Sequence, residues 1–160
     1  MYQLSYIKFE PEDFDLYHRI VNSDKVMKYI TGSASTLERS QNRFKSILES
    51  NTLHQKGGYF KVYDRSQLLG LAKLEQYPKE TDTIEMGYIL MEEFWGMGYG
   101  QTIGHDLVQF ARQNELAKYV IGIIDPANIA SKRILLKCGL ESYFLGEENN
   151  LPTEKLRLKL

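Results

Sequence analysis

Three glycines at alternate positions stand directly before an amphipathic run in the stretch EEFWGMGYGQTIGHDLVQFA, residues 92–111. The run that follows has the apolar spacing of a helix, with Ile103, Leu107, Phe110 and Ala111 on one stripe. The start of a helix offers unpaired N–H groups and a partial positive charge. Gly96, Gly98 and Gly100 have no Cβ, so the backbone there can approach a ligand closely. The stretch therefore predicts an anion site, most simply for a phosphate, at the start of this helix.

The spacing of the glycines excludes the two commonest nucleotide-binding motifs. The dinucleotide fingerprint G-x-G-x-x-G would need a third glycine where Gln101 or Ile103 stands. The P-loop would need a Gly-Lys-Ser/Thr sequence, which does not follow. Taken alone, the stretch also fits an ordinary strand-to-helix turn.

The pattern of apolar residues predicts one mixed α/β domain over residues 1–160. Helices are expected at 11–22, at 35–50 with a capping box of Ser35 and Glu38, after the glycines, and at 128–139. Strands are expected at 3–9, 59–64, 68–75, 83–91, 118–124, 140–145 and 154–160, with an acidic loop at 146–150. The order is βααβββαβαββ.

Composition narrows the function. The net charge is -1 with no basic patch, which argues against a nucleic-acid partner. The single cysteine, Cys138, excludes an internal disulfide framework and fits a reducing compartment. The N-terminus lacks the pattern of a signal peptide, and no run approaches the ~20 apolar residues of a membrane span. We therefore expect a cytoplasmic protein that does not span a membrane. No metal site is expected either, because His18, His54 and His105 are scattered along the sequence.

A second motif, NIASKRILLKCGL, begins at Asn128. Asn128, Ser131 and Leu135 fall at i, i+3 and i+7, on one helical face. By itself this motif fits a helix capped by Asn128, with Ser131 as a surface residue.

The two motifs together resemble the GNAT superfamily of N-acyltransferases, and more narrowly its RimJ/RimL-type branch, which modifies protein N-terminal amines. FWGMGYGQTIGHDLVQFA resembles the family's pyrophosphate loop, and NIASKRILLKCGL its Asn-x-x-Ser helix. DKVMKYITG and IEMGYIL resemble the segments after its first helix and before its loop. Trp95 stands where the superfamily has Gln or Arg. The resemblance implies a mixed, mostly antiparallel seven-stranded sheet flanked by about four helices and splayed between its fourth and fifth strands.

The resemblance also implies acetyl-CoA as co-substrate. Its diphosphate is expected to be held by the backbone N–H groups of Met97, Gly98, Tyr99, Gly100 and Gln101, in a loop that begins at Gly96. A side chain in place of Gly98 or Gly100 would obstruct the diphosphate. Ile89, Leu90 and Met91 are expected to pair with the pantetheine like an added strand. Asn128 is expected to bind the pantetheine or the acetyl end, together with Ser131, while Trp95 either flanks the cofactor or, as we favour, packs in the core.

Direct acyl transfer needs a base for the amine proton, a donor to the oxyanion and an acid for the leaving thiolate. Glu85 is the candidate base; its structural alternative is an ion pair with a lysine such as Lys73. Many superfamily members carry an acidic tyrosine where this chain has Leu135, so Ser131 is the substitute acid and Tyr143 the reserve.

Three function classes follow. The first is an acetyltransferase of a primary amine, most simply a protein or peptide N-terminus, with a polyamine or an antibiotic as the other acceptors. The second is a decayed acyl-CoA-binding regulatory protein, and the third is a purely structural module. The sequence is compatible with a monomer or a homodimer.

Overall fold

The computed structural model describes residues 2–160. Its seven strands form one sheet in the order β1-β2-β3-β4-β5-β7-β6. The strands are β1 (Leu4–Lys8), β2 (Gly58–Asp64), β3 (Gln67–Gln76), β4 (Thr83–Leu90), β5 (Tyr119–Ile124), β6 (Glu141–Glu148) and β7 (Leu151–Lys159). The helices are η1 (Pro11–Asp13), α1 (Phe14–Val21), α2 (Asp24–Met27), α3 (Leu37–Leu53), η2 (Glu92–Phe94), α4 (Tyr99–Arg112) and α5 (Ile129–Lys137). The expected α/β class and seven-stranded sheet are confirmed.

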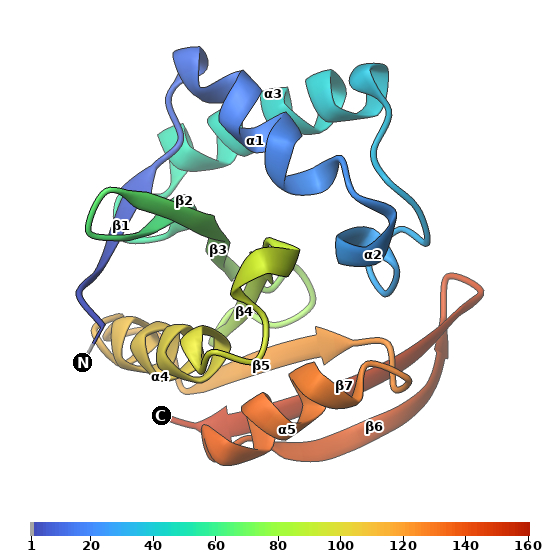
Figure 1. The fold of residues 1–160 in the computed structure, drawn as a ribbon. Coiled ribbons are helices and arrows are strands. Elements are labelled where there is room, and N and C mark those ends of the chain that lie inside the picture. Colours follow the sequence, from blue (N-terminus) through green and yellow to red (C-terminus); the bar gives the residue numbers. More distant parts are fainter. Residues whose placement is uncertain (1) are drawn as a thin grey trace. The chain divides into compact units, whose positions relative to one another are not determined.

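The chain divides into two compact units. Unit 1 comprises Met1–Lys73 and Tyr88–Tyr99. In it α1 and α3 lie beside each other (Figure 1), and an aromatic cluster of Phe9, Tyr17 and Phe44 fills the core with ring centroids 5.4–6.0 Å apart. A buried ion pair between Lys61 and Asp13, with N and O 2.5 Å apart, ties β2 to η1.

Unit 2 comprises Leu74–Gly87 and Gly100–Leu160. Here β5 pairs in parallel with β4 from Thr83↔Tyr119 to Met86↔Gly122, and antiparallel with β7. Helix α5 packs on β5, where Leu135 lies over Gly122, and it reaches β7 through the ion pair of Lys132 with Glu154 at 2.9 Å. The predicted stripe of α4 is confirmed for Ile103, Leu107 and Ala111, which are fully or almost fully buried.

Two local predictions were wrong. The cap of α3 is Thr36, whose hydroxyl accepts the Arg39 N–H at 3.2 Å, one residue after the expected Ser35. The expected loop at 146–150 is mostly strand, because β6 continues to Glu148 and only Asn149 and Asn150 form the turn. Both asparagines have left-handed backbones, with φ of 51° and 61°, as a two-residue hairpin turn requires.

Among residues 2–160, no helix is long and apolar enough to cross a membrane. Within the same range, no group of three or more His, Cys, Asp or Glu side chains is placed to hold a metal ion.

Candidate active site

The loop between η2 and α4 owes its shape to two glycines. Gly96 and Gly98 have φ of 74° and 88°, a left-handed conformation that costs other residues roughly 1–2 kcal/mol. Gly100 lies within the first turn of α4 instead, so its backbone does not require glycine. Glycine at 96 and 98 is thus explained by backbone conformation.

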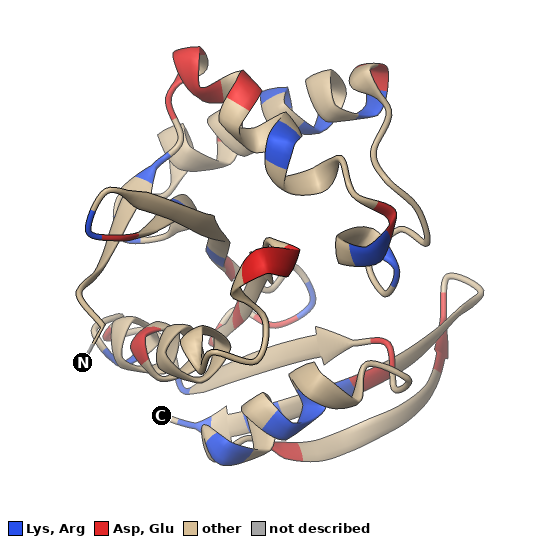
Figure 2. Ribbon diagram, in the orientation of Figure 1, with Lys and Arg blue, Asp and Glu red and all other residues tan. Residues whose placement is uncertain are grey.

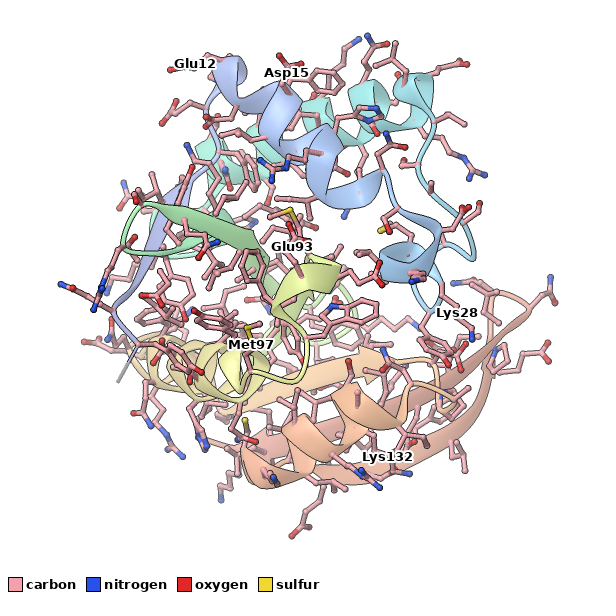
Figure 3. The ribbon with its side chains drawn as sticks, viewed as in Figure 1. Glu12, Asp15, Lys28, Glu93, Met97 and Lys132 are labelled. Carbon is pink, nitrogen blue, oxygen red and sulfur yellow. The ribbon has the colours of Figure 1, made fainter. Side chains whose placement is uncertain are left out.

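The loop delivers a row of backbone donors. The first N–H groups of α4, from Tyr99 through Gly100 and Gln101, have no acceptor within the helix. Met97, between the two left-handed glycines, exposes its side chain to solvent on the segment leading into α4 (Figure 3). This arrangement suits a ligand with several anionic oxygens.

The side chain of Tyr99 is an anchor rather than a ligand group. It is only 8% exposed and packs edge-on against Phe94, with ring centroids 6.0 Å apart. Its hydroxyl donates to Asp64 Oδ2 at 2.9 Å, and this hydrogen bond raises the pKa of Tyr99. Tyr99 can therefore offer a ligand its backbone N–H alone.

Trp95 does not pack in the core, contrary to the interpretation we favoured. Its side chain is 46% exposed, and its indole Nε1–H donates to the Leu90 carbonyl at 2.9 Å. The indole therefore spans from the loop back to the end of β4.

The end of β4 presents its backbone groups to two different sides. The Met91 N–H donates to the Leu69 carbonyl of β3 at 3.0 Å, so it is already occupied. The Ile89 carbonyl also approaches β3, since a Cβ on Gly70 would lie 1.9 Å from its oxygen. Because backbone groups alternate sides along a strand, those of Leu90 point away from β3. Leu90 is thus the residue of this segment whose backbone is directed away from β3, and the pairing expected for Ile89, Leu90 and Met91 stays a prediction.

The start of α5 is built by Asn128. Its Oδ1 accepts the Ser131 N–H at 3.2 Å, which caps the helix. The cap uses the side-chain oxygen and leaves the amide NH₂ as donor. The predicted helix end is confirmed at Gly139, which has φ of 90° directly after the C-cap Cys138.

Leu135 shows why no acidic tyrosine stands on this helix. It is buried, and a Cβ on Gly122 of β5 would lie 2.7 Å from its Cδ1. The glycine and the leucine are therefore fitted to each other, and the larger tyrosine ring would need a different partner on β5. Half-buried Ser131 lies one turn earlier on the same helix.

Glu85 and α5 lie on opposite faces of the sheet. Glu85 is aligned with Ile121 across β4 and β5, and the next pair is Met86 with Gly122. Gly122 faces α5 through Leu135, so Glu85, one residue earlier on its strand, faces the other side. The structure thus does not bring the candidate base Glu85 and the candidate acid Ser131 together on one face.

Tyr143 lies on the face of Glu85. Ile121 is aligned in turn with Arg157 on β7, whose guanidinium lies 4.7 Å from the Tyr143 ring centroid. Burial raises the pKa of Tyr143, although Lys155 acts in the opposite direction, so the phenol is protonated at neutral pH.

The acidic residues of the β6–β7 hairpin are partly neutralised. Glu148 Oε1 lies 2.6 Å from Lys155 Nζ and 3.1 Å from Lys79 Nζ. These two hydrogen bonds, the one from Lys155 above all, lower the pKa of Glu148. Of the expected acidic loop, only the exposed Glu147 keeps a carboxylate outside this network.

The sequence analysis missed a buried carboxylate, Glu154. Its side chain is 1% exposed, its Oε1 lies 2.9 Å from Lys132 Nζ of α5, and its Oε2 has no hydrogen-bond partner among residues 2–160. Burial alone would raise the pKa of Glu154, but hydrogen bonds with Lys132 and Ser142 hold it below its ordinary value. Lys132 belongs to a row of basic residues along α5 (Figures 2 and 3). The alternation of β7 was a usable signal, because Glu154 falls two residues before inward-facing Leu156.

The chain matches the acetyltransferase (GNAT) domain family over residues 3–141. It is 33% identical over 67 residues to an FsC-acetyl coenzyme A-N(2)-transacetylase of Aspergillus fumigatus; the match covers 40% of this chain and 28% of that protein. The chain thus spans little more than a quarter of the length of this curated relative.

Solved structures show the same fold. The aminoglycoside acetyltransferase AAC(6')-Ib in complex with coenzyme A superposes with a TM-score of 0.82 at 15% identity, covering 98% of this chain and 95% of that one. RimL, a ribosomal L7/L12 α-N-protein acetyltransferase in complex with coenzyme A, also superposes with a TM-score of 0.82, at 12% identity, covering 98% and 94%. At these identities the likeness extends to the fold alone.

Proposed function

We propose, for a chain that belongs to the GNAT acetyltransferase family, that it moves an acetyl group from acetyl-CoA to a primary amine by direct attack in a ternary complex. The observation that carries this proposal is the pair of left-handed glycines, Gly96 and Gly98, directly before α4. They turn a strand-to-helix connection into a diphosphate cradle. We further propose that residues 1–160 work as one acetyltransferase domain, cytoplasmic and either monomeric or homodimeric.

The co-substrate would lie along the segment from the end of β4 to the start of α4. N–H groups from Met97 to Gln101 hold the diphosphate, and the backbone of Leu90 pairs with the pantetheine. Asn128 offers its amide NH₂ to the pantetheine or the acetyl end. Trp95 flanks the cofactor, which its exposure supports, and its indole holds the Leu90 carbonyl until the pantetheine takes that position.

Glu85 is the proposed base, and it takes the proton from the amine as the C–N bond forms. A backbone N–H at Leu90 steadies the oxyanion. The C–S bond then breaks, and Ser131 gives the thiolate a proton, with Tyr143 as the reserve.

We propose an N-terminal α-amine as the acceptor, as in the RimJ/RimL-type branch. An α-amino group has a pKa of about 7.7–8.0 and a lysine side chain about 10.4, so at pH 7 roughly 10% of α-amines are neutral against about 0.04% of lysine amines. The candidate machinery is one carboxylate of β4, Glu85, on the face opposite α5, and a buried leucine at 135. Such machinery suits the amine that needs the least deprotonation.

The test is a panel of acceptors: peptides with a free N-terminus and an internal lysine, the same peptides with a blocked N-terminus, spermidine and an aminoglycoside. Mass mapping should find the acetyl label mainly on the α-amine. If the label is found mainly on lysine, or only on the small amines, the proposed acceptor is wrong and the proposed acetyltransferase activity stands. Binding of acetyl-CoA without any transfer would support a decayed, acyl-CoA-binding regulatory protein.

A further inference from the structure

One carboxylate joins the N-terminal segment to the start of α4. Asp64, the last residue of β2, accepts the Gln3 N–H through Oδ1 at 3.1 Å and the Tyr99 hydroxyl through Oδ2 at 2.9 Å. The next residue, Arg65, has a left-handed backbone and donates its own N–H to the Gln3 carbonyl at 3.2 Å. The N-terminal segment is therefore fixed beside the first residue of α4.

Tyr2 extends this connection onto the glycine loop. Its ring lies against that of Tyr99, with centroids 4.1 Å apart and planes 35° from parallel. Its hydroxyl donates to the carbonyl of Met97, 95 positions further along the chain. A Cβ on Gly98 would lie 3.7 Å from the same hydroxyl oxygen, so Tyr2 contacts Met97 and Tyr99 and lies beside Gly98 between them.

Such contacts matter because a loop with two left-handed glycines is intrinsically free to rearrange. Each residue that a ligand must order costs free energy on binding, and a loop that is already ordered avoids that cost. The hydrogen bond from Tyr99 to Asp64 persists at neutral pH, since the phenol stays protonated.

We propose that Tyr2 and Asp64 are positioning residues of the diphosphate site: they hold the loop at Met97–Tyr99 in its binding shape without touching the ligand. This inference rests on the proposed function of the loop. It predicts an effect on the affinity for the diphosphate and none on the chemical step.

The experiment compares two acetyl donors that share a thioester. Acetyl-CoA carries the diphosphate, and S-acetylpantetheine lacks it. In Tyr2→Leu and Asp64→Ala, KM for acetyl-CoA and Kd for CoA should each rise about tenfold, with kcat at saturation within about twofold and kcat/KM for S-acetylpantetheine unchanged. Tyr2→Phe keeps the ring and should recover most of the affinity. The matched control is Tyr29→Leu, which removes a tyrosine of similar exposure elsewhere in unit 1, 37% against 39%.

Circular dichroism and the unfolding midpoint establish that each variant is folded; Tyr2→Met replaces Tyr2→Leu, and Asp64→Asn replaces Asp64→Ala, where the first choice is not folded. Unchanged CoA affinity in folded variants overturns the positioning role, as does an equal loss with both donors. If the wild-type protein binds no CoA, the proposed function itself is wrong. If the wild-type protein binds CoA and the variants bind it equally well, only the positioning role is wrong.

Discussion

The indole N–H of Trp95 occupies the carbonyl oxygen of Leu90, at 2.9 Å, on the side of β4 that faces away from β3. This is the position at which an added strand, or a pantetheine arm, would place its own N–H donor. Trp95 is also the sole tryptophan of the chain, so its fluorescence reports on this position alone.

Acetyl-CoA should therefore change the emission of Trp95, because its pantetheine amide competes with the indole for Leu90. Trp95→Phe cannot donate this hydrogen bond and should bind acetyl-CoA more tightly, by about two- to twelvefold, given roughly 0.5–1.5 kcal/mol for one hydrogen bond. Fluorescence titration and calorimetry measure the two effects. Weaker binding by Trp95→Phe would show that the indole supports the cofactor instead of competing with it.

Gly98→Ala should weaken acetyl-CoA binding, since alanine at φ of 88° costs roughly 1–2 kcal/mol and drives the loop toward another shape. Gly32→Ala is the matched control, because Gly32 has φ of 86° and open space around its Cβ position. Both variants should lose similar stability in thermal unfolding, and only Gly98→Ala should lose part of the thermal shift that acetyl-CoA produces. If acetyl-CoA produces the same thermal shift in both variants, the loop at Gly98 does not bind the diphosphate.

Glu85→Gln should lower kcat by about 10²–10⁴-fold, the range for a general base, with little change in acetyl-CoA affinity. Glu141→Gln, an exposed glutamate on β6, is the control and should stay at the wild-type rate. A Glu85→Gln rate within about threefold of wild type would assign Glu85 a structural role, such as the cross-strand ion pair.

Ser131→Ala should cost about tenfold in kcat, less than Glu85→Gln, because a thiolate with a pKa near 8.5 leaves tolerably without an acid. Tyr143→Phe should be nearly neutral while Ser131 is present, because Tyr143 is the reserve donor, although its ring lies beside Arg157 on the face of Glu85. Steady-state rates of both single variants and the double decide between them. A larger loss of kcat in Tyr143→Phe than in Ser131→Ala would make Tyr143 the proton donor. No loss of kcat in the double variant would leave water or a backbone group as the donor.

Glu148 should make the hairpin sensitive to acid. Its pKa is lowered in the folded chain by Lys155 and Lys79, so the stabilisation is present above its ordinary pKa of 4.5 and is lost as pH falls through the lower folded value. Glu148→Gln should therefore unfold more easily than wild type at pH 7, with a difference that shrinks toward pH 3. Glu147→Gln, at the exposed neighbour outside this network of ion pairs, is the matched control. A constant difference for Glu148→Gln would contradict the ion-pair account.

The sequence predicts the elements that carry local signals. The α5 helix follows from its cap at Asn128 and from Gly139 after its C-terminus, and the succession of the seven strands and the longer helices along the chain follows from apolar spacing. The hairpin turn was also present, as two asparagines between alternating runs, but the neighbouring acids suggested a longer loop. The contacts of Tyr2 and Asp64 with the loop carry no such signal, because they join residues 95 and 35 positions apart through single hydrogen bonds. The exposure of Trp95 likewise depends on a tertiary contact with Leu90 and not on residue type.

The turn at Asn149 and Asn150 has a consequence for how the chain reaches its native state. Because only two residues join β6 to β7, the first pairs of this hairpin form between residues close in sequence, and such hairpins close in about 1–10 μs. The pairing of β5 with β7 then requires α5 to cross over, and it closes a much longer loop. We therefore expect the β6–β7 hairpin to form early and the rest of unit 2 to fold onto it. A β-branched residue in place of either asparagine would slow this folding as well as strain the turn.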